Sequence, residues 1–311
     1  MNTAVKGRFA PSPSGYMHMG NLLSMLLAWL DARALGGAML FRMEDLDPAR
    51  SEERFAQAAA ADLKKLGLHW EEGYPAPDYC QSRRTELYED AFQTLRNRGL
   101  VYPCWCSRAQ RLAASAPHPG ELQHDPGCRC ARFSAAERES MLSSGRRPAW
   151  KIRVPDETFT VEDVHYGSFT QNLARDCGDF ILRRSDGVFA YQLAVSLDDA
   201  AMGVTRVVRG RDLLSSAPRQ VWLISLLGGV APVYAHGPLL TADSHKLSKR
   251  LGSLNTQSLF SRHTPEALVG LLAYTAGLID RPESVAAADL IPGFSWDKIP
   301  REDLAPPEAL A

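Results

Sequence analysis

The feature that most constrains the fold is a glycine- and proline-rich loop near the N-terminus that runs into an apolar segment. Residues 11–21 read PSPSGYMHMGN, and the leucine-rich segment 20–35 has the pattern of a buried helix, closed by a glycine pair. The stretch 5–10 before the loop is typical of a short strand. A loop between a strand and a helix lies at the carboxyl edge of a parallel sheet, where such folds bind ligands.

Strands and helices continue to alternate after this loop. We expect a second strand over 39–44 and amphipathic helices over about 51–66 and 83–98. This alternation predicts an α/β fold with a Rossmann-like, doubly wound parallel sheet. Further strands are expected at 151–154, 158–162, 179–183, 188–195 and 204–210, an apolar helix at 219–227, and a helical, then proline-rich region from about 257.

Composition limits the class of protein. The 311 residues are 45% apolar and 23% charged, as in a globular protein of one large or two ordinary domains. A net charge of −1 excludes a strongly basic nucleic-acid binder but permits a local basic face. The longest apolar run is far shorter than the ~20 residues that cross a membrane. We expect a cytoplasmic protein without a signal peptide or membrane partner.

A second short motif lies near the other end of the chain. Residues 246–250 read KLSKR and carry two lysines three positions apart. The two motifs could close on a nucleoside triphosphate from two sides, because helix N-terminal amides and His18 suit phosphate and a lysine stabilises charge developing there. Taken alone, the first motif could be a helix-capping turn and the second a solvated basic loop.

In this order the motifs resemble the nucleotide-binding signatures of class I aminoacyl-tRNA synthetases. Asn21, where many of these enzymes have a second histidine, and the variants Leu247 and Arg250 resemble the glutamate and glutamine branch. The resemblance covers about residues 5–260. It implies catalytic roles for His18, Lys246 and Lys249, and ATP contacts, with Mg²⁺, at His18, Gly20, Asn21, Ser248 and Lys249.

Three further blocks resemble glutamyl-tRNA synthetases, at 8–13 (RFAPSP), 41–47 (FRMEDLD) and 207–214 (VVRGRDLL). The resemblance implies glutamate contacts at Arg8, Ala10, Ser12, Glu44, Tyr191 and Arg209. The chemistry agrees, because arginines grip carboxylates bidentately and a carboxylate pairs with the substrate ammonium. Without the resemblance, these residues could be surface ion pairs or, for Tyr191, a core aromatic in a strand.

Four of the six cysteines lie close together, which favours a metal over disulfides in a cytosolic enzyme. The resemblance is to a structural zinc site with two cysteines and then an aromatic ligand four residues before a third cysteine. It implies the ligands Cys104, Cys106, His124 and Cys128. The rival set replaces His124 by Cys130, and spacing does not decide between them. Four free or buried cysteines are the third possibility.

Only about 60 residues follow Arg250, whereas glutamyl-tRNA synthetases continue into a large anticodon-binding region. The chain therefore resembles a shortened paralogue that activates L-glutamate with ATP and esterifies it to the queuosine base at the wobble position of tRNA(Asp). A small synthetase charging the 3′ end of tRNA(Glu) and an inactive regulatory homologue are the alternatives. We expect a monomer with a catalytic core at 1–103 and 188–256, a zinc-containing insertion at 104–187 and a helical C-terminal region at 257–311.

Overall fold

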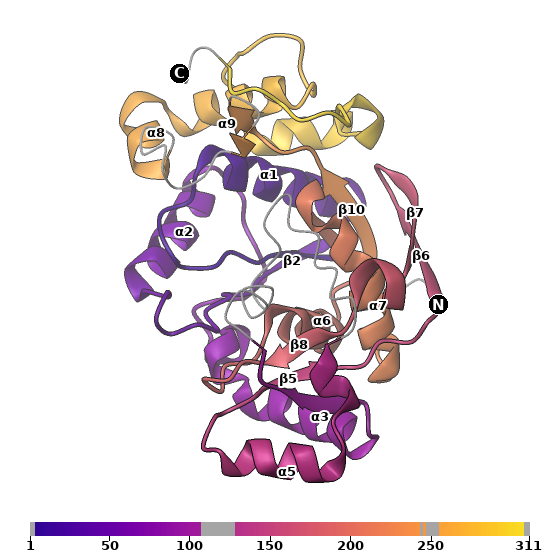
Figure 1. Ribbon diagram of the computed structural model, residues 1–311. Helices are drawn as coiled ribbons and strands as arrows, with labels where there is room; N and C mark the ends of the chain where they lie inside the picture. The colour runs from indigo at the N-terminus through magenta and orange to yellow at the C-terminus, as the bar shows by residue number, and fades with distance from the viewer. Residues whose placement is uncertain (1–3, 107–127, 243–244, 247–254, 308–311) are drawn as a thin grey trace.

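The N-terminal part of the chain alternates between strands and helices, as the sequence predicts (Figure 1). The computed structural model describes residues 4–106, 128–242, 245–246 and 255–307. The first elements are β1 (Lys6–Phe9), α1 (Met19–Ala34), β2 (Ala38–Phe41), α2 (Glu53–Lys65), β3 (Glu72–Gly73) and α3 (Thr85–Asn97). The three strands pair in parallel in the order β1-β2-β3.

The second half of the chain supplies the other strands of the core. These are β6 (Thr158–Asp163), β7 (Gly167–Asn172), β9 (Arg206–Gly210) and β10 (Val233–Gly237), in the order β7-β6-β10-β9. All of these pairings are parallel except that of β6 with the edge strand β7. The backbone N–H of Thr205, just before β9, donates to the carbonyl of Lys6 at 3.0 Å, so β9 lies beside β1.

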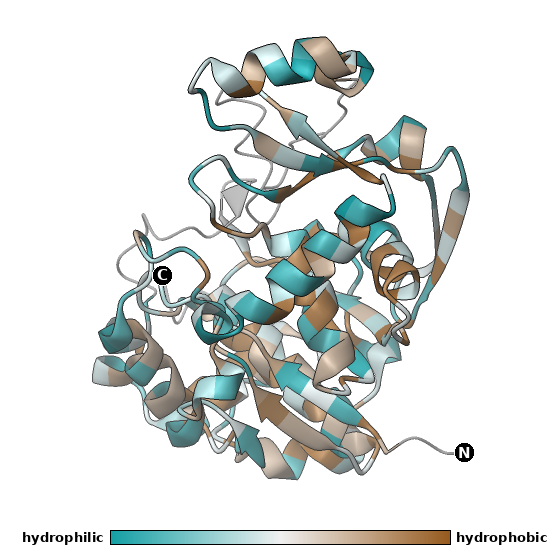
Figure 2. Cartoon of the chain, turned by 90° about the horizontal axis from the view of Figure 1, so that it is seen from below, coloured by the Kyte–Doolittle hydropathy of each residue, from teal (hydrophilic) through white to brown (hydrophobic). Residues whose placement is uncertain are grey.

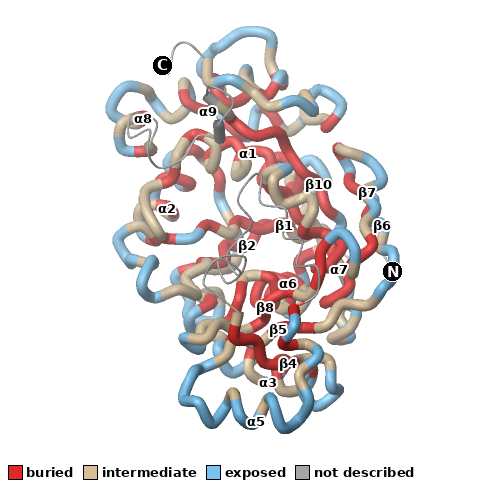
Figure 3. Tube along the Cα trace, in the orientation of Figure 1, coloured by how far each residue is buried: buried red, intermediate tan, exposed pale blue. Residues whose placement is uncertain are grey.

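Successive residues of the core strands point to two different hydrophobic clusters. Val208 and Ala235 belong to the cluster that α1 fills, whereas Val207 and Tyr234 face Ala217, the first residue of α7 (Ala217–Leu226). Strands with helices on both faces confirm the doubly wound prediction. The strands and α1 are largely buried (Figure 3), and hydrophobic and hydrophilic residues alternate along the surrounding helices (Figure 2).

One predicted strand is wrong. Residues 188–195 do not extend as a strand, because the helix α6 (Tyr191–Ala201) begins at Tyr191. Buried positions run without a break from Gln192 to Ser196, and the helix packs against α7, α3 and β8 (Phe180–Arg183). A helix enclosed on several sides has no polar face, so its sequence lacks the periodicity that distinguishes it from a buried strand.

The region around the cysteines contains a small antiparallel sheet, which Figure 1 places with α5 at the end of the molecule opposite α8 and α9. It is made of β4 (Val101–Cys104), β5 (Ala149–Ile152) and β8, with α5 (Ala135–Ser143) alongside. β6 and β7 lie within the 104–187 region but belong to the core sheet, because β6 pairs with the core strand β10 and β7 pairs with β6. The domain boundaries stay a prediction.

The C-terminal region is helical, as predicted, and covers the far side of α1. It comprises α8 (Thr256–Arg262), α9 (Pro265–Thr275) and short 3-10 turns at Ala287–Gly293 and Trp296–Lys298. Leu268, Leu272 and Trp296 join the cluster around α1. Among the described residues, no helix combines the length and hydrophobicity needed to cross a membrane.

Candidate functional site

The histidine loop is a tightly capped helix start. His18 is the N-cap of α1: its Nδ1 accepts from the backbone N–H of Gly20 at 3.1 Å, and its own N–H donates to Asn21 Oδ1 at 3.0 Å. A Cβ on Gly20 would lie 3.1 Å from the His18 ring, so this close approach favours glycine. Since Nδ1 is an acceptor, the proton of the neutral ring is on Nε2.

The chain on both sides of the lysine motif lies against this loop. At the start of the motif, β11 (Thr241–Ala242) pairs with β12 (His245–Lys246), and just before β11 the Cβ of Leu240 is 3.9 Å from a Cβ built on Gly20. After it, Asn255 forms a bridge with His18, and Thr256 donates to the carbonyl of Met17. The structure thus brings the flanks of the two motifs together. The side chain of Lys246, and Ser248 and Lys249, lie outside the described residues.

The residues expected to bind glutamate sit at the carboxyl edge of the sheet and at the start of α6. Arg8 is on β1, Ala10 and Ser12 are on the loop after it, and Arg209 is on β9. Glu44 follows β2, and its N–H donates to the carbonyl of Pro11 at 2.9 Å. Ser12 is exposed, whereas Arg8 and Arg209 are buried.

Charges surround the hydroxyl of Tyr191, the first residue of α6. Burial raises the pKa of Tyr191, and the charges of Arg209, Glu44, Arg8 and Asp199 act on it as well. Arg209 Nη1 donates to the Tyr191 hydroxyl at 3.5 Å. Four of the predicted contacts, Arg8, Glu44, Tyr191 and Arg209, therefore lie in one region, together with the carboxylate of Asp199.

A carboxylate that the sequence reasoning missed connects two of these residues. Asp199 Oδ1 accepts from Arg8 Nε at 3.2 Å and from Arg42 Nη1 at 2.7 Å. Arg42, fully buried, also pairs with Glu44 Oε1 at 3.0 Å. Burial raises the pKa of Glu44, whereas Arg42 and Arg8 outweigh burial and lower the pKa of Asp199. Two adjacent acidic residues in an otherwise apolar run were the available signal.

Arg209 is held by four side-chain and backbone groups. It donates to Gln220 Oε1 at 2.8 Å, His236 Nε2 at 3.0 Å and the Leu213 carbonyl at 3.2 Å, besides Tyr191. Its guanidinium also lies 5.0 Å from the ring centre of Tyr234. The sequence reasoning missed these partners as well, since His236 and Gln220 are far from Arg209 in the chain. A buried guanidinium with this many partners has one orientation.

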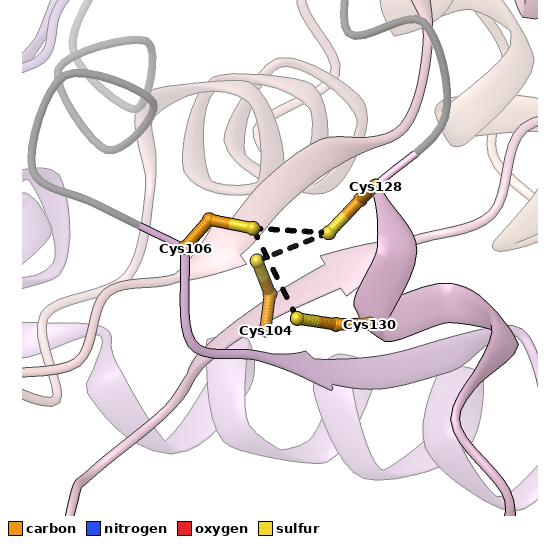
Figure 4. A group of neighbouring side chains, drawn as sticks. All are labelled: Cys104, Cys106, Cys128 and Cys130. Carbon is orange, nitrogen blue, oxygen red and sulfur yellow. Dashed lines mark hydrogen bonds between the residues drawn. The ribbon is translucent and has the colours of Figure 1, made fainter.

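The four cysteine sulfurs converge from two short stretches of chain (Figure 4): Cys104 ends β4 and Cys106 follows it, while Cys128 directly precedes the turn Arg129–Arg132, which contains Cys130. All four lie within 4.8 Å of one another, with Cys104 and Cys106 each 3.4 Å from Cys128 and Cys106 3.9 Å from Cys130. Hydrogen bonds from the Cys104 and Cys106 thiols lower the pKa of Cys128 to about 5. Tetrahedral zinc with ~2.3 Å bonds separates its sulfurs by about 3.8 Å, so the residues fit this ion. His124 lies outside the described residues.

Comparisons with known proteins agree with this geometry. Residues 4–273 match the family model of tRNA synthetases class I (E and Q), catalytic domain. A protein of Symbiobacterium thermophilum named Glutamyl-Q tRNA(Asp) synthetase is 46% identical over 98% of this chain and 97% of its own. One of the same name from Nitratidesulfovibrio vulgaris is 45% identical, over 97% and 96%.

A solved structure has a similar fold. The glutamate tRNA ligase of Elizabethkingia meningosepticum, in complex with its amino acid, superposes with a TM-score of 0.78 and 23% identity. The match covers 98% of this chain and 68% of that one. At this identity the likeness concerns the fold alone.

Proposed function

The chain belongs to the class I tRNA synthetases of the glutamate and glutamine type, and on this premise we propose that it activates L-glutamate with ATP and transfers it to the queuosine base of tRNA(Asp). The observation that carries the proposal is the grouping of Arg8, Arg209 and Glu44 near Tyr191: Arg209 donates to the Tyr191 hydroxyl, and Arg8 and Glu44 are linked through Asp199 and Arg42. The named relatives, which this chain matches over nearly their whole length, support the choice of acceptor. The proposal places the reaction in the cytoplasm, carried out by a monomer.

The charge pattern of the pocket suits a dicarboxylic amino acid. Arg8 and Arg209 offer guanidinium groups to two carboxylates, and Glu44 offers a carboxylate to the ammonium. The hydroxyls of Tyr191 and Ser12 add neutral hydrogen bonds that orient the substrate, and the small side chain of Ala10 leaves room for it. Burial raises the pKa of Glu44 despite its ion pair with Arg42, and the ammonium of the substrate would be a further positive charge that favours the ionised carboxylate.

Activation requires alignment and neutralisation of charge. An oxygen of the glutamate α-carboxylate attacks the α-phosphorus of ATP, and the bond to the bridging oxygen breaks, giving glutamyl-adenylate and pyrophosphate. We assign Nε2 of His18 to the phosphate oxygens, because its Nδ1 is engaged by the Gly20 N–H, and we place Gly20, Asn21 and Ser248 beside the nucleotide. Lys246 and Lys249 stabilise the charge that develops on the leaving pyrophosphate, and Mg²⁺ supplies further neutralisation when bound.

The transfer of glutamate to the tRNA depends mainly on the correct positioning of the two reactants. A hydroxyl of the queuosine cyclopentene-diol attacks the carbonyl carbon of glutamyl-adenylate, and AMP leaves with the bonding electrons. Because AMP is a good leaving group, the hydroxyl proton can pass to solvent without a strong protein base. Holding the two reactants together then supplies most of the rate gain.

We also propose that Cys104, Cys106, Cys128 and Cys130 hold a structural zinc ion. The four sulfurs form a complete donor set, and they lie in the small subdomain rather than beside the nucleotide loop. Metal analysis of Cys104→Ala tests this proposal. Zinc content should fall to near zero, and unchanged zinc would refute it.

The function is tested by two assays on the full chain. ATP–pyrophosphate exchange should depend on L-glutamate and be lost in Arg209→Ala, which removes one carboxylate contact. Labelled glutamate should then be transferred to queuosine-containing tRNA(Asp), but not to tRNA(Asp) without queuosine or to tRNA(Glu). Labelling of tRNA(Glu) alone would support the small synthetase, and an absence of exchange with every tRNA present would support an inactive homologue.

A further inference from the structure

The guanidinium of Arg209 ends a line of three buried side chains that crosses neighbouring strands. Arg209 Nε donates to His236 Nε2 at 3.0 Å, and His236 Nδ1 lies 2.6 Å from Asp163 Oδ2. The three residues belong to β9, β10 and β6, which are adjacent in the sheet, and His236 is in register with Arg209. All three are buried, so water does not compete for these hydrogen bonds.

The position of the imidazole proton follows from these contacts. A guanidinium has only donors, so Nε2 of His236 must accept and carries no proton. Burial and the charge of Arg209 lower the pKa of His236 to about 4, although Asp163 opposes them, and the ring is therefore neutral at pH 7. Its single proton is on Nδ1, where it is donated to the carboxylate of Asp163.

The carboxylate is itself fixed in orientation. Asp163 Oδ1 accepts from the backbone N–H groups of His165 at 3.0 Å, Tyr166 at 2.9 Å and His236 at 3.3 Å. Only Oδ2 faces the imidazole ring. Asp163 thus selects one tautomer of His236, and this tautomer presents a lone pair to Arg209.

We propose that Asp163 and His236 are positioning residues that set the orientation of Arg209 and so the affinity for glutamate, without contacting the substrate. The inference rests on the proposed function, because it takes Arg209 to be a glutamate contact. Substrate binding by a guanidinium depends on direction, since its donors lie in one rigid plane. The hydrogen bond from Arg209 Nε to His236 therefore sets the orientation of the guanidinium plane.

The isosteric change Asp163→Asn reverses the tautomer. The three backbone N–H groups require an oxygen at the Oδ1 position, so the amide nitrogen takes the place of Oδ2. The amide donates to Nδ1 of His236, and the imidazole proton moves to Nε2. That proton then faces the N–H of Arg209 Nε, and two donors meet at the former 3.0 Å hydrogen bond.

Steady-state exchange kinetics measure the consequence. In Asp163→Asn the KM for glutamate should rise about ten- to a hundredfold, the cost of one lost hydrogen bond to a buried charged group, while kcat and the KM for ATP change little. Asp31→Asn is the matched control. Asp31 is an equally buried carboxylate that accepts from Arg206 and Trp296 at 2.8 Å, away from the pocket, and its variant should keep the glutamate KM.

The tautomer is read directly by NMR of ¹⁵N-histidine-labelled protein. His236 should be protonated at Nδ1 in the parent chain and at Nε2 in Asp163→Asn, a change that a merely structural role would not require. A parent ring protonated at Nε2 would overturn the proposal, whether or not the variant folds. So would an unchanged glutamate KM in a folded variant, or KM values for glutamate and ATP that rise together. Failure of the parent chain to activate glutamate would instead overturn the proposed function.

Discussion

The proposed glutamate pocket and the cysteine cluster hold their polar side chains by different means. In the pocket, Asp199 and its arginine partners are buried within the main core and joined by direct ion pairs between β1, α6 and the residue after β2. The hydrophobic cluster around the cysteines has five buried residues, three of them cysteines, and α5 buries none of its own. A large core can enclose paired charges, whereas a small one needs a cross-link or metal.

The largest effect on stability and activity is expected from substitution of Asp199. Asp199→Asn leaves two buried guanidinium groups without their shared carboxylate, which should lower the free energy of unfolding by about 3–5 kcal/mol. It should also reduce glutamate-dependent exchange about a hundredfold or more, because Arg8 loses its anchor. Denaturant titration and exchange kinetics measure the two effects.

The matched control is Asp186→Asn, which removes the exposed partner of Arg184. An exposed ion pair contributes about 0–1 kcal/mol, so this variant should resemble the parent chain. Equal losses in both variants would mean that burial does not distinguish these ion pairs.

The second prediction concerns the cysteine cluster. Cys128→Ser removes the sulfur that contacts both Cys104 and Cys106, so zinc content should fall from about one ion per chain to near zero. Protease sensitivity should increase around β4 and α5, while glutamate-dependent exchange falls only a few-fold, because distant sites act nearly independently. Cys80→Ser, outside the cluster, should keep the zinc. Loss of exchange as large as in Asp199→Asn would show that the two regions are not separate.

The smallest expected effect is local to α5. Ser134 Oγ accepts from the N–H of Glu137 at 3.2 Å, and the Glu137 side chain reaches back to the N–H of Ser134 at 2.7 Å. Ser134→Ala should destabilise the helix by about 1 kcal/mol, a roughly fivefold loss of hydrogen-exchange protection in its amides. Ser144→Ala, at the other end of α5, is the control. Protection lost equally across the core would contradict a local effect.

The sequence correctly predicted the helices that are buried on one face and exposed on the other. α2 and α3 each place a few buried residues along one face, and their predicted ranges differ from the observed ones by a few residues. α6 was mistaken for a strand because its buried residues form a continuous run. Periodicity reports the contrast between a buried and an exposed face, and α6 lacks that contrast.

The residues that we propose as glutamate contacts were predictable from the sequence. Arg8, Glu44 and Arg209 were found through short motifs and Tyr191 through the family resemblance, and the structure brings them together. The residues that orient them were not found, because their contacts join positions far apart in the chain, such as Arg8 with Asp199. No local pattern encodes a pairing that only the completed sheet and α6 create.

Two neighbouring carboxylates on α6 have a mechanical consequence. Asp199 binds the pocket arginines, while Asp198 accepts from Gln81, Arg84 and Tyr88, the last of which belongs to α3. Successive helical side chains point about 100° apart, so α6 cannot rotate about its axis without straining both sets of bonds. The rotation of α6 about its axis is therefore fixed by both carboxylates, so a shift of α3 would also change the orientation of Arg8.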